Sequence, residues 1–345
     1  MYNPSTKFME LEIYQHFTDL DADKWDKLLT KSETDVPFLR FGYLKNWWEF
    51  KGGGEWPDDS QLFLITAKEN ERLVGIAPLF SPDNTSAKRL LLLGSVEISD
   101  YLDVICLPEY KESFLNNLLH FIHSEMGEFL QINLMNIPEK SSTLELLNIN
   151  AHLYKWAVKI EQTYRTPAIK LEDNWEAYLA SIDKKQRHEI RRKMRRAEEY
   201  DVEIQWYIVN HSHALATEIE AFFSLMAMDA KKERFLTSQM RQQMSAIIHW
   251  AFNEGILQLS FLEIDGKKVA SYLCFDYGKK ILVYNSGFDF NYSEYSPGWV
   301  LLSYLIQNAI NSGKTHFDFM RGDETYKYRF GAKDSFVMQA TLTRV

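Results

Sequence analysis

The chain has 345 residues, of which 46% are hydrophobic and 25% are charged, a composition typical of ordinary globular proteins. The net charge of −9 argues against a DNA-binding protein, which would carry a basic surface. The longest apolar runs have the length of strands and fall short of the ~20 residues of a membrane-spanning helix. Residues 1–15 contain no apolar stretch typical of a signal peptide, so we expect a cytoplasmic protein without a membrane span.

The two cysteines, Cys106 and Cys274, lie in apolar, strand-like stretches far apart in the sequence. This spacing indicates neither a disulfide framework nor a zinc cluster. We therefore predict two buried thiols and no metal site.

The order of secondary-structure signals repeats in the two halves of the chain. Each half contains a hairpin pattern, at residues 61–80 and 257–275, in which two apolar runs flank a charged turn. Each hairpin is followed by a strand, an amphipathic helix and a second strand, at residues 90–107, 112–126 and 130–137, and at residues 280–287, 298–311 and 316–320. Helical segments precede both hairpins. This pattern predicts an α/β (α+β) protein with two domains, residues 1–160 and 161–345, each a mixed, mostly antiparallel sheet flanked by helices.

The densest charge cluster is Lys184–Arg196, which contains eight Lys/Arg and one Glu and so has a local charge of +7. Apolar residues recur in and around it at helical spacing, namely Ile182, Ile190, Met194 and Ala197. The segment is predicted to be an amphipathic helix with a basic face. Because arginine pairs well with phosphate and carboxylate, Arg187, Arg191 and Arg192 are candidates for binding an anionic ligand. The alternative is a solvated face neutralised by acidic residues elsewhere.

A second candidate site lies in Asn285–Trp299, between a predicted strand and a predicted helix. Ser296 is expected to cap that helix, and Pro297 is expected to occupy its first turn. The free N–H groups and the positive end of the helix dipole would then form a site for an anion such as pyrophosphate. The alternative is an ordinary capped helix.

A third candidate site follows the short apolar strand in Phe317–Ala332. Charged residues gather at the end of this strand, namely Asp318, Arg321, Asp323, Glu324, Lys327 and Arg329. Glycines 322 and 331 would allow the backbone to turn there. A carboxylate in this set could accept a proton while Arg or Lys binds an anionic group, so the segment is a candidate catalytic rim. The alternative is an ion-pair network.

These segments resemble a known family. The sequences KKQRHEIRRKMRRAEE, SPGWVLLSYLIQNAI and FDFMRGDETYKYRFGA look like the GNAT domain of the bacterial cellulose-biosynthesis acetyltransferases, the CelD/BcsL-like group. The stretches PFLRFGYLKNWWEF and LLLLGSVEISDYLDVI extend the resemblance to the first half. The architecture is also similar to the Fem peptidoglycan aminoacyltransferases, which consist of two GNAT-like halves. The resemblance implies two tandem GNAT-like domains, of which the first is degenerate and the second is the acyltransferase domain.

The resemblance further implies transfer of an acyl group from acetyl-CoA or another acyl-CoA to an amine or hydroxyl, as an N- or O-acyltransferase. The residues implied for donor binding follow the fourth strand of the second half and begin the next helix, namely Asn285, Ser286, Tyr295, Ser296, Pro297 and Gly298. A backbone N–H near Tyr284–Ser286 would polarise the thioester carbonyl. Asp318 or Asp323 would remove a proton from the acceptor, and Tyr284 would return one to the thiolate.

Three functions stay open. The first is acyl transfer from acyl-CoA to a small-molecule, glycan or lipid-linked acceptor in polysaccharide or cell-envelope synthesis. The second is Fem-like transfer from charged tRNA, which the basic helix favours and the net charge of −9 opposes. The third is a non-catalytic scaffold of a polysaccharide-synthesis complex, favoured by the single glycine in the donor loop.

Overall fold

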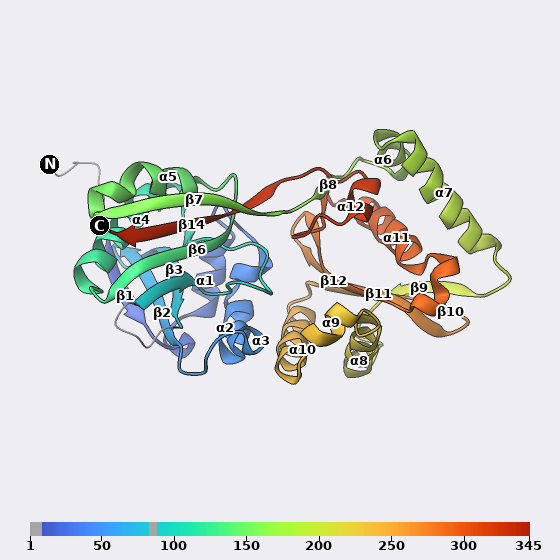
Figure 1. Cartoon of the computed structure of the whole chain (residues 1–345), viewed down its shortest axis with the longest axis horizontal. Coiled ribbons are helices and arrows are strands. Elements are labelled where there is room, and N and C mark those ends of the chain that lie inside the picture. Colours follow the sequence, from blue (N-terminus) through green and yellow to red (C-terminus); the bar gives the residue numbers. More distant parts are fainter. Residues whose placement is uncertain (1–8, 83–87) are drawn as a thin grey trace. The chain divides into compact units, whose positions relative to one another are not determined.

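The computed structural model describes residues 9–82 and 88–345. It divides into two compact units, each built around a mixed sheet with helices on it (Figure 1). Unit 1 contains the described residues up to Tyr164 together with Phe336–Val345, and unit 2 is Arg165–Ser335. The predicted fold class, two mixed α/β domains in tandem, is confirmed.

The division of the chain differs from the expected residues 1–160 and 161–345 in one respect. The last ten residues lie in unit 1, because the strand Phe336–Arg344 (β14) pairs with Phe129–Pro138 (β6) in the sheet of that unit. Such a pairing joins residues about 200 positions apart, and the local pattern contains no sign of it.

Unit 1 has the strand order β1-β2-β3-β4-β6-β14-β7, and β5 pairs with β3. The bounds of the remaining strands are Glu10–Tyr14 (β1), Gln61–Glu69 (β2), Arg72–Ser81 (β3), Lys88–Leu92 (β4), Ile105–Cys106 (β5) and Trp156–Arg165 (β7). The helices are Ala22–Leu29 (α1), Phe41–Glu49 (α2), Lys51–Gly54 (α3), Lys111–Glu125 (α4) and Ser142–Asn150 (α5). The predicted hairpin is β2–β3, and β4 runs parallel to β6 across α4.

The strand expected at residues 90–107 is interrupted. Only its two ends, β4 and β5, are extended, and the chain between them turns at Gly94, where φ is +103°. Asp103 in this loop is fully buried. Its carboxylate accepts hydrogen bonds from the hydroxyls of Thr34 (2.8 Å), Ser141 (2.5 Å) and Thr143 (2.6 Å). A buried carboxylate with these partners is satisfied only in the loop conformation, which explains the missing middle of the strand.

Lys111, at the start of α4, completes this buried polar network. Its Nζ lies 2.7 Å from the carboxylate of Glu33 and 3.4 Å from that of Asp103, and its side chain is only 4% exposed. Burial opposes the ionised form of Glu33, but hydrogen bonds from Lys111 and Ser142 hold the pKa of Glu33 below its usual value. The network therefore depends on one buried cation.

Replacing this cation tests the network. Lys111→Met would leave the buried carboxylate of Asp103 without its countercharge, and we expect a loss of about 3–5 kcal/mol in the free energy of unfolding, measured in urea. The control is Lys24→Met, because Lys24 lies 3.8 Å from Asp21 in a largely exposed pair, and such pairs contribute less than ~1 kcal/mol. Equal losses in the two variants would contradict this account.

Unit 2 has the strand order β8-β13-β12-β11-β10-β9. The strands are Ala168–Lys170 (β8), Ile204–Ile208 (β9), Leu257–Ile264 (β10), Lys267–Tyr277 (β11), Lys280–Phe288 (β12) and His316–Asp318 (β13). The helices are Trp175–Ser181 (α6), Lys184–Glu199 (α7), Leu215–Met226 (α8), Ala230–Phe235 (α9), Ser238–Asn253 (α10), Pro297–Asn311 (α11) and Thr325–Arg329 (α12). The predicted hairpin is β10–β11, and β12 and β13 are parallel on either side of α11, as the strand–helix–strand pattern indicated.

The helices of unit 2 cover both faces of its sheet. α6, α7 and α11 lie on one face, and α8, α9 and α10 lie on the other (Figure 1). The predicted apolar seam of α7 is confirmed, since Ile190 and Ala197 are buried in the core that α11 shares. On the opposite face α8 packs tightly on β12 at Gly287, where a Cβ atom would come within 2.5 Å of the backbone of Leu225 and Met226.

This close approach makes Gly287 sensitive to substitution. Gly287→Ala would force α8 away from β12, and we expect unfolding in urea to show a loss of about 1–3 kcal/mol. Gly127→Ala serves as the control, because a Cβ there would meet nothing closer than 3.8 Å. A Gly287→Ala protein as stable as the control would contradict the tight packing.

Both cysteines are buried, free thiols, as predicted, and burial raises the pKa of Cys106 to about 12. Within the described ranges, no helix has the length and apolarity needed to cross a bilayer. Among the residues that the structure describes, no group of three or more His, Cys, Asp or Glu side chains could hold a metal ion. Residues 1–8, on which the expectation about the N-terminus partly rests, lie outside the described residues.

Candidate functional site

The candidate site begins where two parallel strands of unit 2 separate. β12 pairs with β13 only through Lys280–Leu282, which lie opposite His316–Asp318. β12 then continues to Phe288, whereas the chain leaves β13 after Asp318. One edge of β12 is therefore not paired with β13 beyond Leu282. An open strand edge presents backbone N–H and C=O groups to a ligand that lies alongside it.

A β-bulge interrupts the pairing of β12 with β11 along the same stretch of β12. Leu273 of β11 pairs with Asn285, whereas Cys274 pairs with Val283, so Tyr284 is the extra residue. Bulges re-aim side chains and are common beside functional sites. The bulge falls within Tyr284–Ser286, the segment that the family resemblance implies for polarising the thioester carbonyl of the donor.

A lysine from α9 contacts β12 just after the bulge. Nζ of Lys232 donates a hydrogen bond to the carbonyl oxygen of Ser286 at 2.5 Å and lies 3.3 Å from Ser286 Oγ. Burial lowers the pKa of Lys232, and the carboxylates of Asp229 and Glu324 oppose this shift. Glu324, at the start of α12, is therefore close enough to Lys232 to interact with it electrostatically.

Two phenols belong to this part of unit 2, the buried Tyr272 of β11 and the half-buried Tyr326 of α12. Burial raises the pKa of both Tyr272 and Tyr326, so both hydroxyls stay protonated at neutral pH. The negative charge of Glu324 raises the pKa of Tyr326 further. Tyr272 pairs with Ser286 in the sheet, so their side chains share a face. We name the group Lys232, Ser286, Glu324 and Tyr326 the polar centre.

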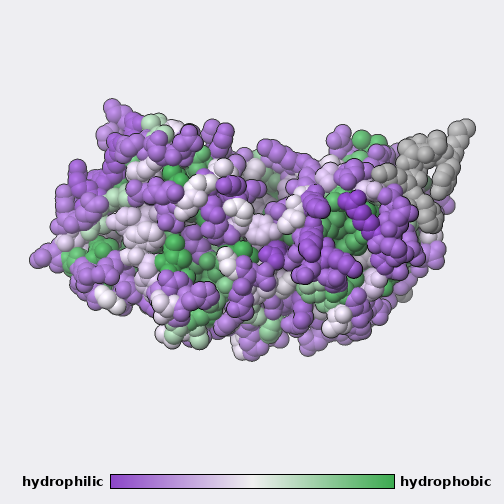
Figure 2. Space-filling view, turned by 180° about the vertical axis from the view of Figure 1, so that it is seen from behind, coloured by the Kyte–Doolittle hydropathy of each residue, from purple (hydrophilic) through white to green (hydrophobic). Residues whose placement is uncertain are grey.

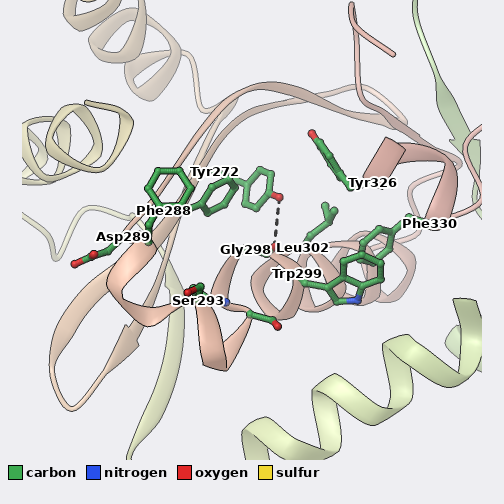
Figure 3. Close-up of a pocket in the computed structure, with 12 residues that line it drawn as sticks. Tyr272, Phe288, Asp289, Ser293, Gly298, Trp299, Leu302, Tyr326 and Phe330 are labelled. Carbon is green, nitrogen blue, oxygen red and sulfur yellow. Dashed lines mark hydrogen bonds between the residues drawn. The ribbon is translucent and has the colours of Figure 1, made fainter. Parts of the chain in front are cut away.

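Next to the polar centre lies a pocket of about 300 Å³, here called the aromatic pocket. Its aromatic lining residues are Tyr272, Phe288, Phe290, Trp299, Tyr326 and Phe330. Figure 3 shows five of these rings, all but that of Phe290, around the start of α11. The Tyr272 hydroxyl is directed at the Gly298 carbonyl, 3.3 Å away. Ser296, Pro297 and Gly298, three of the implied donor residues, line the same pocket. Tyr295 instead packs on Tyr200, with ring centroids 4.6 Å apart.

The start of α11 differs in detail from the expected cap. Ser296 is the N-cap residue and Pro297 is the first helical residue, as predicted. Ser296, however, has a left-handed backbone with φ of +52°, and its side chain makes no capping bond. Its hydroxyl accepts a hydrogen bond from Nζ of Lys193 on α7 at 2.7 Å. The N–H of Gly298 has no acceptor among the residues that the structure describes.

Lys327, predicted in the catalytic rim, is enclosed by its own turn. It is buried, and its Nζ donates to the carbonyls of Arg321 at 2.8 Å and Gly322 at 3.1 Å. It also pairs with the carboxylate of Glu324 at 2.9 Å. These three acceptors use all three ammonium protons, so Lys327 stabilises the turn and orients Glu324.

The other residues of the predicted rim do not converge on one point. Oδ1 of Asp318 accepts a hydrogen bond from the N–H of Met320 at 2.7 Å and so closes the turn after β13. Asp323 is exposed and interacts with Arg165. Arg329 is exposed on the side of α12 that faces α7. Of the predicted carboxylates, Glu324 is the one in the polar centre.

The basic face of α7 lines a second pocket of about 620 Å³. We name it the basic pocket, and its lining residues are Lys185, Gln186, His188, Glu189, Arg192 and Arg329. The three arginines predicted to bind an anion have different partners in the structure, and only one of them lines this pocket. Arg192 lines the pocket and pairs with Glu189 at 2.8 Å, Arg191 pairs with Glu176, and Arg187 donates to the Leu179 carbonyl at 3.4 Å.

The sequence analysis missed several residues of this site, among them Lys193, Lys232, Tyr272 and Tyr326. Lys193 is one of eight basic residues in its segment, and nothing in the sequence distinguishes it from its neighbours. Lys232 stands in a short helix between two longer ones, and its partner lies 54 residues away. Tyr272 reads as an ordinary core residue of a strand. The apolar residues around Tyr272 in the sequence predict that its side chain is buried, but they do not predict a functional role.

Comparison with known proteins supports the fold. Residues 184–328 match the family described as acetyltransferase (GNAT) domain. A search of curated proteins found no match. Among solved structures, FemX shares 13% identity with a TM-score of 0.66, covering 94% of this chain and 96% of FemX. The matched segment lies within unit 2, and the chain as a whole has the same fold as FemX.

Two further structures have the same fold. A conserved protein of unknown function from Bacteroides thetaiotaomicron is 11% identical, with a TM-score of 0.60, over 97% of this chain and 100% of that chain. L-PGS from Bacillus licheniformis is 12% identical, with a TM-score of 0.55, over 94% and 92%. At these sequence identities, the structural similarity establishes the fold of this chain. Its substrates must be inferred from the site itself.

The half-buried position of Lys232 has a measurable consequence. Because burial lowers its pKa in the folded state, the unfolded state binds more protons between that pKa and the ordinary lysine value of about 10.4. The free energy of unfolding of the wild type should therefore rise relative to that of Lys232→Met as the pH approaches 10 from neutral. Urea unfolding at several pH values measures this difference, and Lys231→Met, at an exposed neighbour, is the control. Parallel pH curves for wild type and Lys232→Met would contradict the burial of the charge.

Proposed function

We propose that unit 2 is an acyltransferase that moves an acyl group from an acyl-CoA thioester to an amine or hydroxyl acceptor. The observation that carries the proposal is the edge of the bulged strand β12 that is not paired with β13 beyond Leu282, between the start of α11 and the polar centre. A donor that lies along this edge would place its reactive carbonyl beside Ser286 and Glu324. The match of residues 184–328 to the GNAT domain supports the same reaction class.

The start of α11 fits one phosphate group of such a donor. Lys193 supplies a positive charge, and the Gly298 N–H and the Ser296 hydroxyl supply hydrogen-bond donors at the positive end of the helix dipole. Pro297 has no N–H, so this turn offers fewer backbone donors than a glycine-rich loop. The lysine compensates for the missing donors, and the aromatic pocket beside it suits the less polar arm of the donor.

The polar centre supplies the groups that acyl transfer requires. Glu324 would accept the proton of the acceptor amine or hydroxyl while the acceptor's nitrogen or oxygen bonds to the thioester carbon. Lys232 would stabilise the negative charge that develops on the carbonyl oxygen. The carbon–sulfur bond then breaks, the Tyr326 hydroxyl donates its proton to the thiolate, and Tyr326 regains a proton from solvent. Asp318 and Asp323 remain secondary candidates for the proton acceptor, and Tyr284 remains the second candidate for the proton donor.

Donor binding is the first test. A ligand that binds only the folded protein adds about 2.7 kcal/mol at one hundred times its dissociation constant, so saturating acetyl-CoA and CoA should raise the melting temperature by several degrees. Lys193→Gln should reduce this shift, because it removes the charge beside Ser296. Gly298→Trp should abolish it, because its side chain would fill the pocket against Phe288. The control is Lys45→Gln, at an exposed position of α2.

Each variant is first melted without ligand, so that loss of folding is distinguished from loss of binding. Absence of a shift in the wild type would overturn the proposal. A shift with charged tRNA that falls steeply with salt would then favour the Fem-like alternative, and a response to neither ligand would favour the scaffold.

The proton acceptor is tested by kinetics. Glu324→Gln keeps the shape of the side chain but cannot accept a proton, and we expect kcat to fall about 10²–10⁴-fold with little change in the KM for acetyl-CoA. Release of free CoA is measured against a panel of amino sugars, polyamines and hydroxyl acceptors. Asp323→Asn is the control and should retain kcat. The reverse result would assign the role to Asp323.

The remaining expectations extend this proposal. We infer that the acceptor is a small molecule, a glycan or a lipid-linked precursor, and that the chain acts in the cytoplasm in polysaccharide or cell-envelope synthesis, as the resemblance to the CelD/BcsL-like group implies. Unit 1 would be the degenerate GNAT-like partner that binds the acceptor or supports the fold. An acceptor identified in the panel decides between these classes.

A further inference from the structure

The basic pocket has more positive charge than its ion pairs neutralise. Its one carboxylate, Glu189, already pairs with Arg192, and this pairing lowers the pKa of Glu189. Lys185 and Arg329 have no ion-pair partner among the residues that the structure describes. A concave site with two uncompensated cations, in a chain of net charge −9, is suited to a compact anion.

The basic pocket combines elements that are distant in sequence. Lys185 and Arg192 come from α7, whereas Arg329 comes from α12, more than 130 residues later. A solvated helix face would account for the charges of α7 alone. It does not account for a guanidinium from another element that lines the same hollow of about 620 Å³.

Residues next to one another on α7 and on α12 line or contact the basic pocket and the aromatic pocket, and we call these residues, with Trp299, the wall. Arg192 lines the basic pocket, and the next residue, Lys193, contacts Ser296 at the aromatic pocket. In the same way Arg329 lines the basic pocket, and Phe330 lines the aromatic pocket. The ring of Trp299 lies in this wall, 4.9 Å from Nζ of Lys193 and 4.6 Å from the Phe330 ring (Figure 3). One elongated ligand could therefore occupy both pockets.

We propose that the basic pocket binds a phosphate monoester at the end of the donor opposite its thioester. This proposal rests on the proposed function. CoA carries a pyrophosphate in its middle and a separate 3′-phosphate on its adenosine end. With a middle phosphate at Ser296 and Lys193, the thioester arm follows β12 to the polar centre, and the adenosine end passes the Trp299 wall. Lys185 and Arg329 then bind the dianionic 3′-phosphate.

This arrangement determines which class of donor the protein accepts. An acyl group on the phosphopantetheine of a carrier protein has a phosphodiester and no adenosine 3′-phosphate, so it leaves the basic pocket unfilled. Dephospho-CoA likewise lacks the monoester. The basic pocket therefore selects free acyl-CoA over these donors by a charge-assisted contact that they do not make.

Titration calorimetry compares CoA, dephospho-CoA and adenosine 3′,5′-bisphosphate as the isolated end-group probe. We expect the wild type to bind CoA at least tenfold more tightly than dephospho-CoA. Lys185→Gln with Arg329→Gln should remove this preference and the binding of the probe, and should leave the affinity for dephospho-CoA unchanged. The matched control is Lys184→Gln, at an exposed lysine of α7 that does not line the pocket. Melting temperatures establish that each variant is folded.

Equal affinities of the wild type for CoA and dephospho-CoA would overturn this proposal and leave the proposed function intact. Binding of the probe without binding of CoA would overturn the donor assignment. Salt-dependent binding of tRNA that the double variant loses would also overturn it, by assigning the basic pocket to a polynucleotide.

Discussion

The separation of β12 from β13 after three residue pairs is the constraint on which the site in unit 2 depends. Backbone groups on an edge shielded from water need partners, because an unpaired one costs as much as a lost hydrogen bond. Lys232 satisfies the Ser286 carbonyl on this edge. The same separation makes room for the aromatic pocket beside α11 and brings α12, with Glu324 and Tyr326, next to the bulge.

Most of the cations near the site in unit 2 lie on α7, on one side of the gap between β12 and β13. α7 presents most of its basic residues outward while Ile190 anchors it in the core. Lys193 is the exception, because it turns inward to Ser296 over the ring of Trp299. An ammonium group thereby occupies a position where a glycine-rich turn would present backbone N–H groups. Charge on a side chain and partial charge on a backbone serve the same purpose at a helix start.

The sequence predicted the elements whose signals are local and periodic. The two hairpins, β2–β3 and β10–β11, follow from alternating apolar residues around a charged turn, and α4 and α11 follow from helical periodicity. It did not predict the return of β14 to unit 1 or the loop around Asp103. Both depend on partners distant in sequence, and a local pattern carries no information about such partners.

The candidate site divides in the same way. The segments that carry it, α7, the start of α11 and the turn after β13, were recognisable because clustered charge and turn residues are visible in the sequence. Which of their side chains interact was decided by tertiary structure: Glu324 interacts electrostatically with Lys232 and Tyr326, while Asp318 and Lys327 bind their own turn. Residue type sets what a side chain can do, but packing sets its neighbours, and chemistry between side chains requires contact.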